Sequence, residues 1–123
     1  MSRPIGAVFH LPHGLSNAIL LPTVTAFSWE SAPDRYAGVA RALGCASQTA
    51  SDRDACQALL KYLQKLNGFL ELTQLSQCQN VTRETFDQQV EKIASDAIAS
   101  GSPANNPRQP SQSKIVGLYK QAW

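Results

Sequence analysis

Apolar residues recur at the spacing of an α-helix along most of this chain, and this periodicity limits its fold more than any other feature of the sequence. Leu, Ile, Val, Ala and Phe stand three and four positions apart, so each segment has one apolar face. We find neither a strong alternating strand pattern nor an internal repeat. The 123 residues are enough for one domain with a substantial core. We therefore expect a single all-α domain over residues 1–123, a bundle of about five or six helices.

Proline, glycine and capping residues divide the chain into the expected helices. Pro22 stands inside the first, at about 14–29, and should bend or split it because proline lacks a backbone N–H. The second, 31–44, has Ser31 as its expected N-cap, with Val39 and Leu43 on its apolar face. Three more helices are expected. One should run from Ser51 or Asp52 to Asn67-Gly68, the next from Thr82 to near Ile98, and the last from Ser113 to Trp123. Residues 69–81 should form short turns and 101–112 a loop, whose composition turn chemistry explains.

Charge, hydropathy and cysteine usage exclude several classes of protein. The formal net charge is +2, and the eleven Lys and Arg residues are scattered singly, which argues against a nucleic-acid partner. The longest apolar run, Ala18 to Leu21, is far too short to span a bilayer, and the first residues do not have the layout of a signal peptide. Cys45, Cys56 and Cys78 are an odd number without CxxC spacing, which favours buried, reduced thiols. We therefore expect a cytoplasmic protein with no nucleic-acid or membrane partner.

One histidine stands where functional sites are often built. His13 follows Pro12 at the entry to an apolar helix, where backbone N–H groups lack partners, and histidine is the commonest metal-binding side chain. The chain has only one other histidine, His10, and Pro12 between them argues against a shared helical face, so His10 is expected to be a loop residue. Asn17, one turn beyond His13, is equally consistent with polar support for it and with a surface position.

The order of motifs resembles the C-terminal helical domain of the iron-containing (group III) alcohol dehydrogenase family. The similarity covers nearly the whole chain and is carried by four segments in the family's order. They are Pro4-Ile-Gly6 with Pro12-His-Gly-Leu-Ser-Asn-Ala-Ile-Leu-Leu-Pro22, then Ala32-Pro-Asp-Arg-Tyr36 to Ala40-Arg-Ala-Leu-Gly44, Asp96 to Arg108, and Ile115 to Trp123.

The resemblance implies a two-part enzyme, of which this sequence matches the helical part. In such enzymes an N-terminal α/β domain binds NAD(P), and an Asp and three His hold a divalent metal, iron, in the cleft between the domains. The metal acts as a Lewis acid on the alcohol oxygen while hydride passes to NAD(P)+. His13 matches one of the three histidine ligands, and the other three ligand positions would precede this sequence. Arg3 matches a position near the nicotinamide ring, which makes it a weak candidate for a cofactor contact.

The resemblance leaves the function of the chain by itself open to three readings. No Gly-rich turn follows a strand, so we expect the chain alone to bind neither NAD(P) nor iron, to contain no catalytic residue and to be an inactive fragment. A non-catalytic interaction or oligomerisation module is the alternative, because a former domain interface, Tyr119 and Trp123 would expose apolar surface and favour a homo-oligomer. In the third reading, a separately encoded nucleotide-binding domain docks on this chain in trans and rebuilds the cleft.

Overall fold

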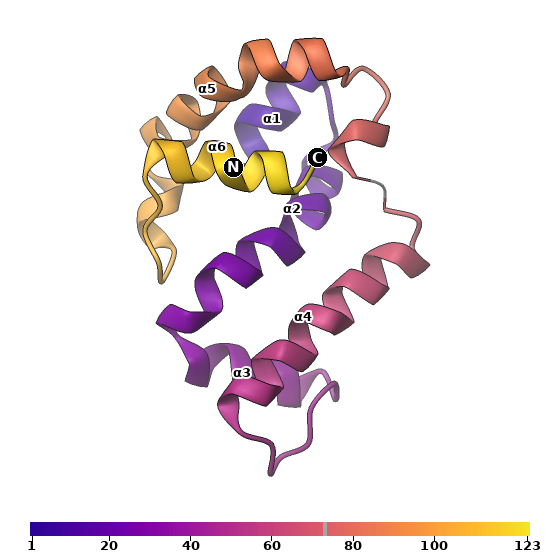
Figure 1. Ribbon diagram of the computed structural model, residues 1–123, viewed down its shortest axis with the longest axis vertical. Helices are drawn as coiled ribbons and strands as arrows, with labels where there is room; N and C mark the ends of the chain where they lie inside the picture. Colours follow the sequence, from indigo (N-terminus) through magenta and orange to yellow (C-terminus); the bar gives the residue numbers. More distant parts are fainter. Residues whose placement is uncertain (73) are drawn as a thin grey trace.

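The computed structural model describes residues 1–72 and 74–123, and every regular element in these residues is helical. This confirms the expected all-α class. The α-helices are α1 (Ser2–Phe9), α2 (His13–Ser28), α3 (Pro33–Ala42), α4 (Asp52–Phe69), α5 (Arg83–Ala99) and α6 (Gln112–Gln121), and the short 3-10 turns are η1 (Trp29–Ser31), η2 (Leu75–Gln77) and η3 (Ser102–Asn105) (Figure 1). Among the described residues, we find no helix with both the length and the apolar character needed to cross a membrane.

The first helix, α1, has no counterpart in the sequence-based expectation. It is only eight residues long and has Pro4 in its first turn, where a missing N–H removes no helical hydrogen bond. Its side chains Ile5 and Phe9 are 0% and 3% exposed. The helix ends at His10, whose φ of 55° is left-handed. Tertiary burial of two side chains, rather than local periodicity, therefore stabilises α1.

Two of the expected helix caps are confirmed and two are wrong. The Ser51 and Thr82 hydroxyls accept hydrogen bonds from Asp54 N and Thr85 N. Ser31 instead lies in η1, and the N-cap of α3 is Ala32, with Pro33 as the first helical residue. At α6 the cap is Ser111, two residues before the expected Ser113, because its hydroxyl is the one that reaches Lys114 N.

Helix α2 continues through Pro22, so the expected split does not occur. Because proline has no N–H, the Ala18 carbonyl four residues earlier loses its intrahelical donor. The side-chain amide of Asn67 donates to this carbonyl at 2.8 Å. Asn67 does not end its own helix, since α4 continues to Phe69. A side chain distant in sequence thus replaces the bond that Pro22 removes.

The buried apolar residues form two clusters. The larger joins α1, α2, α5 and α6, and the smaller lies between α3 and α4, in the lower part of Figure 1. In the smaller cluster Ala37 and Ala40 are fully buried, whereas Val39 and Leu43 are 48% and 50% exposed, contrary to the expected apolar face. Small side chains allow α3 to pack closely on α4, and the larger ones lie outside the contact.

At the aromatic end of the chain, Tyr119 is buried in the larger cluster and Trp123 packs against it, partly buried. Tyr119 is 0% exposed, and its hydroxyl donates to the Met1 carbonyl at 2.6 Å. The Trp123 ring lies 4.5 Å from the Phe86 ring, centroid to centroid, and the Ser76 hydroxyl donates to the Trp123 carbonyl at 2.6 Å. Tyr119 is therefore not available to a partner, whereas Trp123 keeps part of its surface exposed, and a partner surface at this end stays a prediction.

Candidate functional site

His13 is the first residue of α2, and its side chain is exposed to solvent. Pro12 precedes it with an extended ψ of 138°, which turns the chain into the helix. Asn17 lies one turn later, with its amide nitrogen 3.2 Å from the Nε2 atom of His13. Both side chains are exposed, so this contact lies on the helix surface and agrees with both readings of Asn17, polar support of His13 and a surface position.

The described residues contain two imidazoles, His10 and His13, but not a complete metal site. Among residues 1–72 and 74–123, no group of three or more His, Cys, Asp or Glu side chains gathers closely enough to hold an ion. His10 is exposed and belongs to the turn after α1, not to a helical face shared with His13. Catalytic metal sites usually have about three protein ligands. The described residues therefore place no complete ligand set around His13, and its role as a metal ligand stays a prediction.

The cysteine and arginine candidates lie away from His13 in separate contacts. Cys45, Cys56 and Cys78 are free, and each thiol donates to a backbone carbonyl, at 3.2, 3.4 and 3.6 Å respectively. Burial raises the pKa of the Cys56 thiol; Asp52 adds to the rise and Arg41 opposes it, so this thiol is a poor nucleophile. Arg3 is exposed on α1, and its cofactor role stays a prediction.

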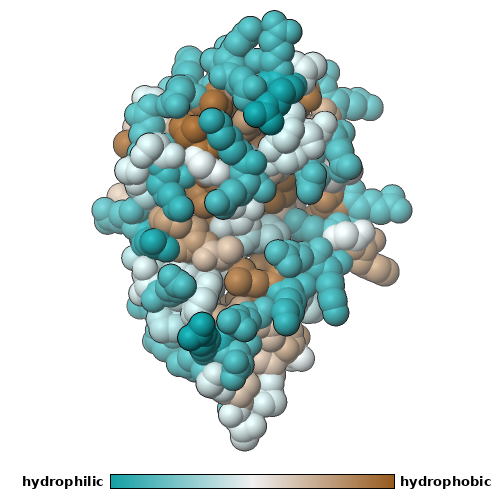
Figure 2. Space-filling model, in the orientation of Figure 1, coloured by the Kyte–Doolittle hydropathy of each residue, from teal (hydrophilic) through white to brown (hydrophobic). Residues whose placement is uncertain are grey.

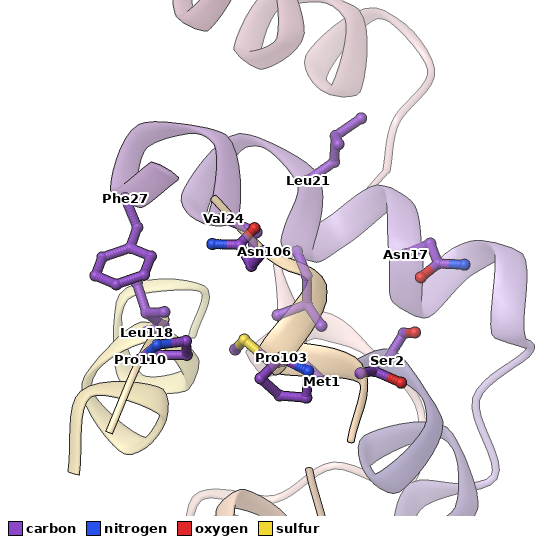
Figure 3. Close-up of a pocket in the computed structure, with 12 residues that line it drawn as sticks. Met1, Ser2, Asn17, Leu21, Val24, Phe27, Pro103, Asn106, Pro110 and Leu118 are labelled. Atoms are coloured by element: carbon purple, nitrogen blue, oxygen red, sulfur yellow. The ribbon is translucent and has the colours of Figure 1, made fainter. Parts of the chain in front are cut away.

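A cavity of about 330 Å³, which we call the α2 pocket, lies beside the His13 turn. Side chains of α2 form one wall, and Met1, Pro103, Pro110 and Leu118 lie across from them (Figure 3). Most of its lining is apolar, with a few amides and hydroxyls. The complete lining is Met1, Ser2, Asn17, Leu20, Leu21, Val24, Phe27, Ser102, Pro103, Asn106, Pro110 and Leu118. Asn17 belongs both to this lining and to the His13 contact, so the imidazole and the pocket are neighbours.

The loop after η3 is tied to the C-terminal end of α2 and borders the pocket. The amide of Asn106 donates to the hydroxyl of Ser28, a fully buried residue, at 2.8 Å. The Arg108 guanidinium donates to the Phe27 carbonyl at 3.1 Å and lies 4.5 Å from the centre of the Phe27 ring. A cation at a helix C-terminus is favourable because it meets unpaired carbonyls and the negative end of the helix dipole.

Sequence reasoning missed this pocket. Its lining comes from α1, α2, η3 and α6, and no local pattern shows that these segments meet. The Asn105–Arg108 loop was explained by turn chemistry alone. A buried serine near the end of α2 would have been a usable signal, since a buried hydroxyl needs a partner.

Comparison with known proteins gives the family. Residues 1–123 match the Fe-containing alcohol dehydrogenase family, C-terminal. The NADPH-dependent butanol dehydrogenase of Clostridium saccharobutylicum is 28% identical over 98% of this chain and 30% of its own length. The lactaldehyde reductase of Escherichia coli K12 is 29% identical over 100% and 31%, and the 1-propanol dehydrogenase of Salmonella typhimurium is 32% identical over 98% and 33%.

Solved structures show the same fold. A 1,3-propanediol oxidoreductase superposes with a TM-score of 0.85 at 23% identity, covering 99% of this chain and 31% of the other. The iron-containing alcohol dehydrogenase of Thermococcus thioreducens superposes with a TM-score of 0.76 at 31% identity, covering 98% and 30%. The chain thus spans about a third of the length of these proteins. With the family match over every residue, the chain belongs to the iron-containing alcohol dehydrogenase family and corresponds to its C-terminal region.

Proposed function

We propose that this chain forms one wall of the active-site cleft of an iron-dependent, NAD(P)-dependent alcohol dehydrogenase, with His13 as one ligand of the metal. The observation that carries this proposal is the shared position of Asn17, which contacts the His13 imidazole at 3.2 Å and lines the α2 pocket. A polar ligand position next to an apolar cavity suits an alcohol, whose oxygen and carbon chain need different surroundings.

The α2 pocket is the proposed place for the carbon chain of the substrate. Leu20, Val24 and Phe27 offer apolar contact, and Asn106 of the loop after η3 also lines the pocket. The names of the relatives refer to butanol, 1-propanol and lactaldehyde. We therefore propose short aliphatic alcohols and aldehydes as the substrate class, since burial of each CH₂ group contributes about 0.8 kcal/mol.

The chain by itself is proposed to be inactive. Its described residues bring no three potential metal ligands together, and they contain no strand followed by a Gly-rich turn that could hold a dinucleotide. The remaining three ligands would come from the part of the helical domain that precedes the matched region in the family, and the NAD(P) site from a nucleotide-binding domain, either in the same polypeptide or docked in trans. In this arrangement Arg3 would lie on the cofactor side of the cleft.

An activity assay tests the inactivity of the chain. We expect no NAD(P)+ reduction by the purified chain with Fe²⁺ and 1-butanol, followed at 340 nm as in any nicotinamide assay. We expect turnover when the whole preceding region of a family member, its nucleotide-binding domain together with the upstream part of its helical domain, is added or fused. Robust turnover by the chain alone would overturn the proposal that it is inactive.

Substitution of each histidine tests the ligand role. In the reconstituted or fused enzyme, we expect His13→Ala to reduce bound iron and alcohol oxidation by at least about tenfold, as for loss of a direct ligand. His10→Ala is the matched control, because His10 is also exposed but stands outside the Asn17 contact. Equal iron content in the two variants would contradict the role of His13.

A second candidate function is self-association. Phe69 is 83% exposed and Leu70 52%, at the end of α4, whereas the face shown in Figure 2 has its hydrophobic areas small and separated by polar ones. Adjacent exposed apolar side chains favour a partner surface. We expect light scattering to show a mass that rises with concentration, and Phe69→Ser to reduce the rise. A strictly monomeric chain up to millimolar concentration would exclude this function.

A further inference from the structure

Pro22 removes one backbone hydrogen bond from α2, and a side chain of another helix replaces it. Pro22 cannot donate to the Ala18 carbonyl, and its ring pushes that carbonyl out of the helical path. The amide of Asn67, in the last turn of α4 and 49 residues away, donates to this oxygen at 2.8 Å. An interhelical bond therefore stands in for the missing intrahelical one at the point where α2 would otherwise be free to hinge.

The part of α2 around Pro22 lies between two cavities. On one side, the α2 pocket is lined by Asn17, Leu20 and Leu21 before Pro22 and by Val24 and Phe27 after it. On the other, a cavity of about 320 Å³ is lined by Ile19, Pro22, Thr23 and Asn67, among others. Any rotation of the first half of α2 against the second therefore changes the shape of the α2 pocket, and it moves His13 with the first half.

We propose that Asn67 is a positioning residue, which holds the two halves of α2 in one orientation and so sets the shape of the α2 pocket and the place of His13. Its significance for catalysis rests on the proposed function, because that function puts the substrate in this pocket. The hydrogen bond from Asn67 to the Ala18 carbonyl does not depend on the proposed function. Asn67 acts through the Ala18 carbonyl and does not line the α2 pocket.

A double-mutant cycle tests the contact. Asn67→Ala leaves the part-buried Ala18 carbonyl without a donor, and we expect the folding equilibrium constant to fall by about tenfold. Pro22→Ala returns an N–H to residue 22, which can bond Ala18 within the helix. In that background we expect Asn67→Ala to cost less than about twofold. Equal losses in both backgrounds would overturn the proposal, because Asn67 would then act only by packing α4 on α2.

A second variant separates the donor from the volume of the side chain. Asn67→Leu keeps a similar size and has no N–H, so we expect it to lose as much stability as Asn67→Ala, by urea denaturation of the full chain. A stability equal to that of the parent chain would overturn the proposal without any use of Pro22→Ala.

NMR signals of the methyl groups that line the α2 pocket report the relative orientation of the two halves of α2. We expect Asn67→Ala to shift the NMR signals of the Leu20, Leu21 and Val24 methyls, and the shift to vanish when Pro22→Ala is also present. Gln64→Ala is the matched control, one turn earlier on α4 and also in the second cavity. Unmoved methyls in Asn67→Ala would overturn the positioning role even if the stability cycle shows coupling.

Titration with 1-butanol separates this inference from the proposed function. We expect the parent chain to show methyl shifts that saturate with 1-butanol, and Asn67→Ala to bind it at least about threefold more weakly. Absence of any 1-butanol effect in the parent contradicts the proposed substrate pocket, while the ligand-free methyl shifts and the stability cycle still decide the role of Asn67.

Discussion

Tyr119 shows how a single polar atom is accommodated in the core. It is the largest fully buried side chain of the described residues, and its hydroxyl donates to the Met1 carbonyl at 2.6 Å. Burial, and to a smaller extent the negative charge of Asp96, raise the pKa of this phenol well above its ordinary value. The folded protein therefore strongly favours the neutral, hydrogen-bonding form.

Tyr119→Phe should lower the free energy of unfolding by about 1–2 kcal/mol at neutral pH, because the Met1 carbonyl loses its donor. Urea denaturation measures this change. Tyr62→Phe is the control, since Tyr62 is 36% exposed and water can replace its contacts. A loss as large in the Tyr62 variant would contradict the special role of the buried hydroxyl.

The same residue predicts a loss of stability in alkali. In the unfolded chain the phenol ionises near its ordinary pKa of 10, whereas in the folded protein its pKa is raised. The stabilisation from Tyr119 is therefore complete below pH 10 and declines as the pH rises above it. We expect unfolding free energies measured from pH 8 to 11 to fall less steeply in Tyr119→Phe than in the parent. Identical slopes would contradict the raised pKa.

At the scale of elements, the turn between α1 and α2 requires a close approach that only glycine allows. A Cβ added at Gly6 would lie 3.0 Å from the Leu11 carbonyl oxygen and 3.4 Å from the Ser16 hydroxyl. The Gly6 carbonyl also accepts from Leu11 N at 3.1 Å, which closes the turn after the helix. This turn places His13 at the start of α2, so its tightness matters for the candidate site.

Gly6→Ala should therefore destabilise the protein by about 1–3 kcal/mol, the usual cost of overpacking. Gly38→Ala is a matched control in α3, where a Cβ meets nothing within 4 Å and should stabilise the helix by up to about 1 kcal/mol. Thermal unfolding of both variants measures these changes, and we expect the midpoint to fall for Gly6→Ala and to rise for Gly38→Ala. A neutral Gly6→Ala would show that the turn can open without loss.

At the scale of the whole molecule, the two apolar clusters differ in the size of their side chains. The larger contains Phe9, Phe86 and Tyr119, whereas the buried residues between α3 and α4 are three alanines with Cys56, Leu59 and Leu63. Burial of apolar area sets local stability, so the α3–α4 pair should be the less stable part. The contact between α2 and α4, which includes Asn67, connects it to the rest.

Native-state hydrogen exchange should show this difference. We expect amides in the middle of α3, such as Ala40, to exchange through a local opening with a lower free energy than amides in α5, such as Ile93. The measurement is exchange at low denaturant, residue by residue. Equal opening free energies in α3 and α5 would indicate one cooperative unit.

Local rules predicted the elements with strong periodicity and missed those that depend on distant contacts. The amphipathic helices now seen as α4 and α5 and their caps at Ser51 and Thr82 follow from spacing and from hydroxyl geometry. Helix α1 is too short for periodicity to show it, and Ser111 and Ser113 present the same cap chemistry two residues apart. The Pro12-His13-Gly14 motif singles out His13, whereas its contact with Asn17 one helical turn later is seen only in the structure.

The all-α class, the family and the imidazole at the start of α2 could be predicted without the structure, because helical periodicity is local and the family motifs are short segments in a fixed order along the chain. Only the tertiary structure decided that Asn67 replaces the bond lost at Pro22, and that Asn106 and Arg108 tie a loop to the end of α2 beside an apolar pocket. The physical reason is the same in each case. A carbonyl or hydroxyl removed from water needs a partner, and which distant side chain supplies it depends on how the helices pack.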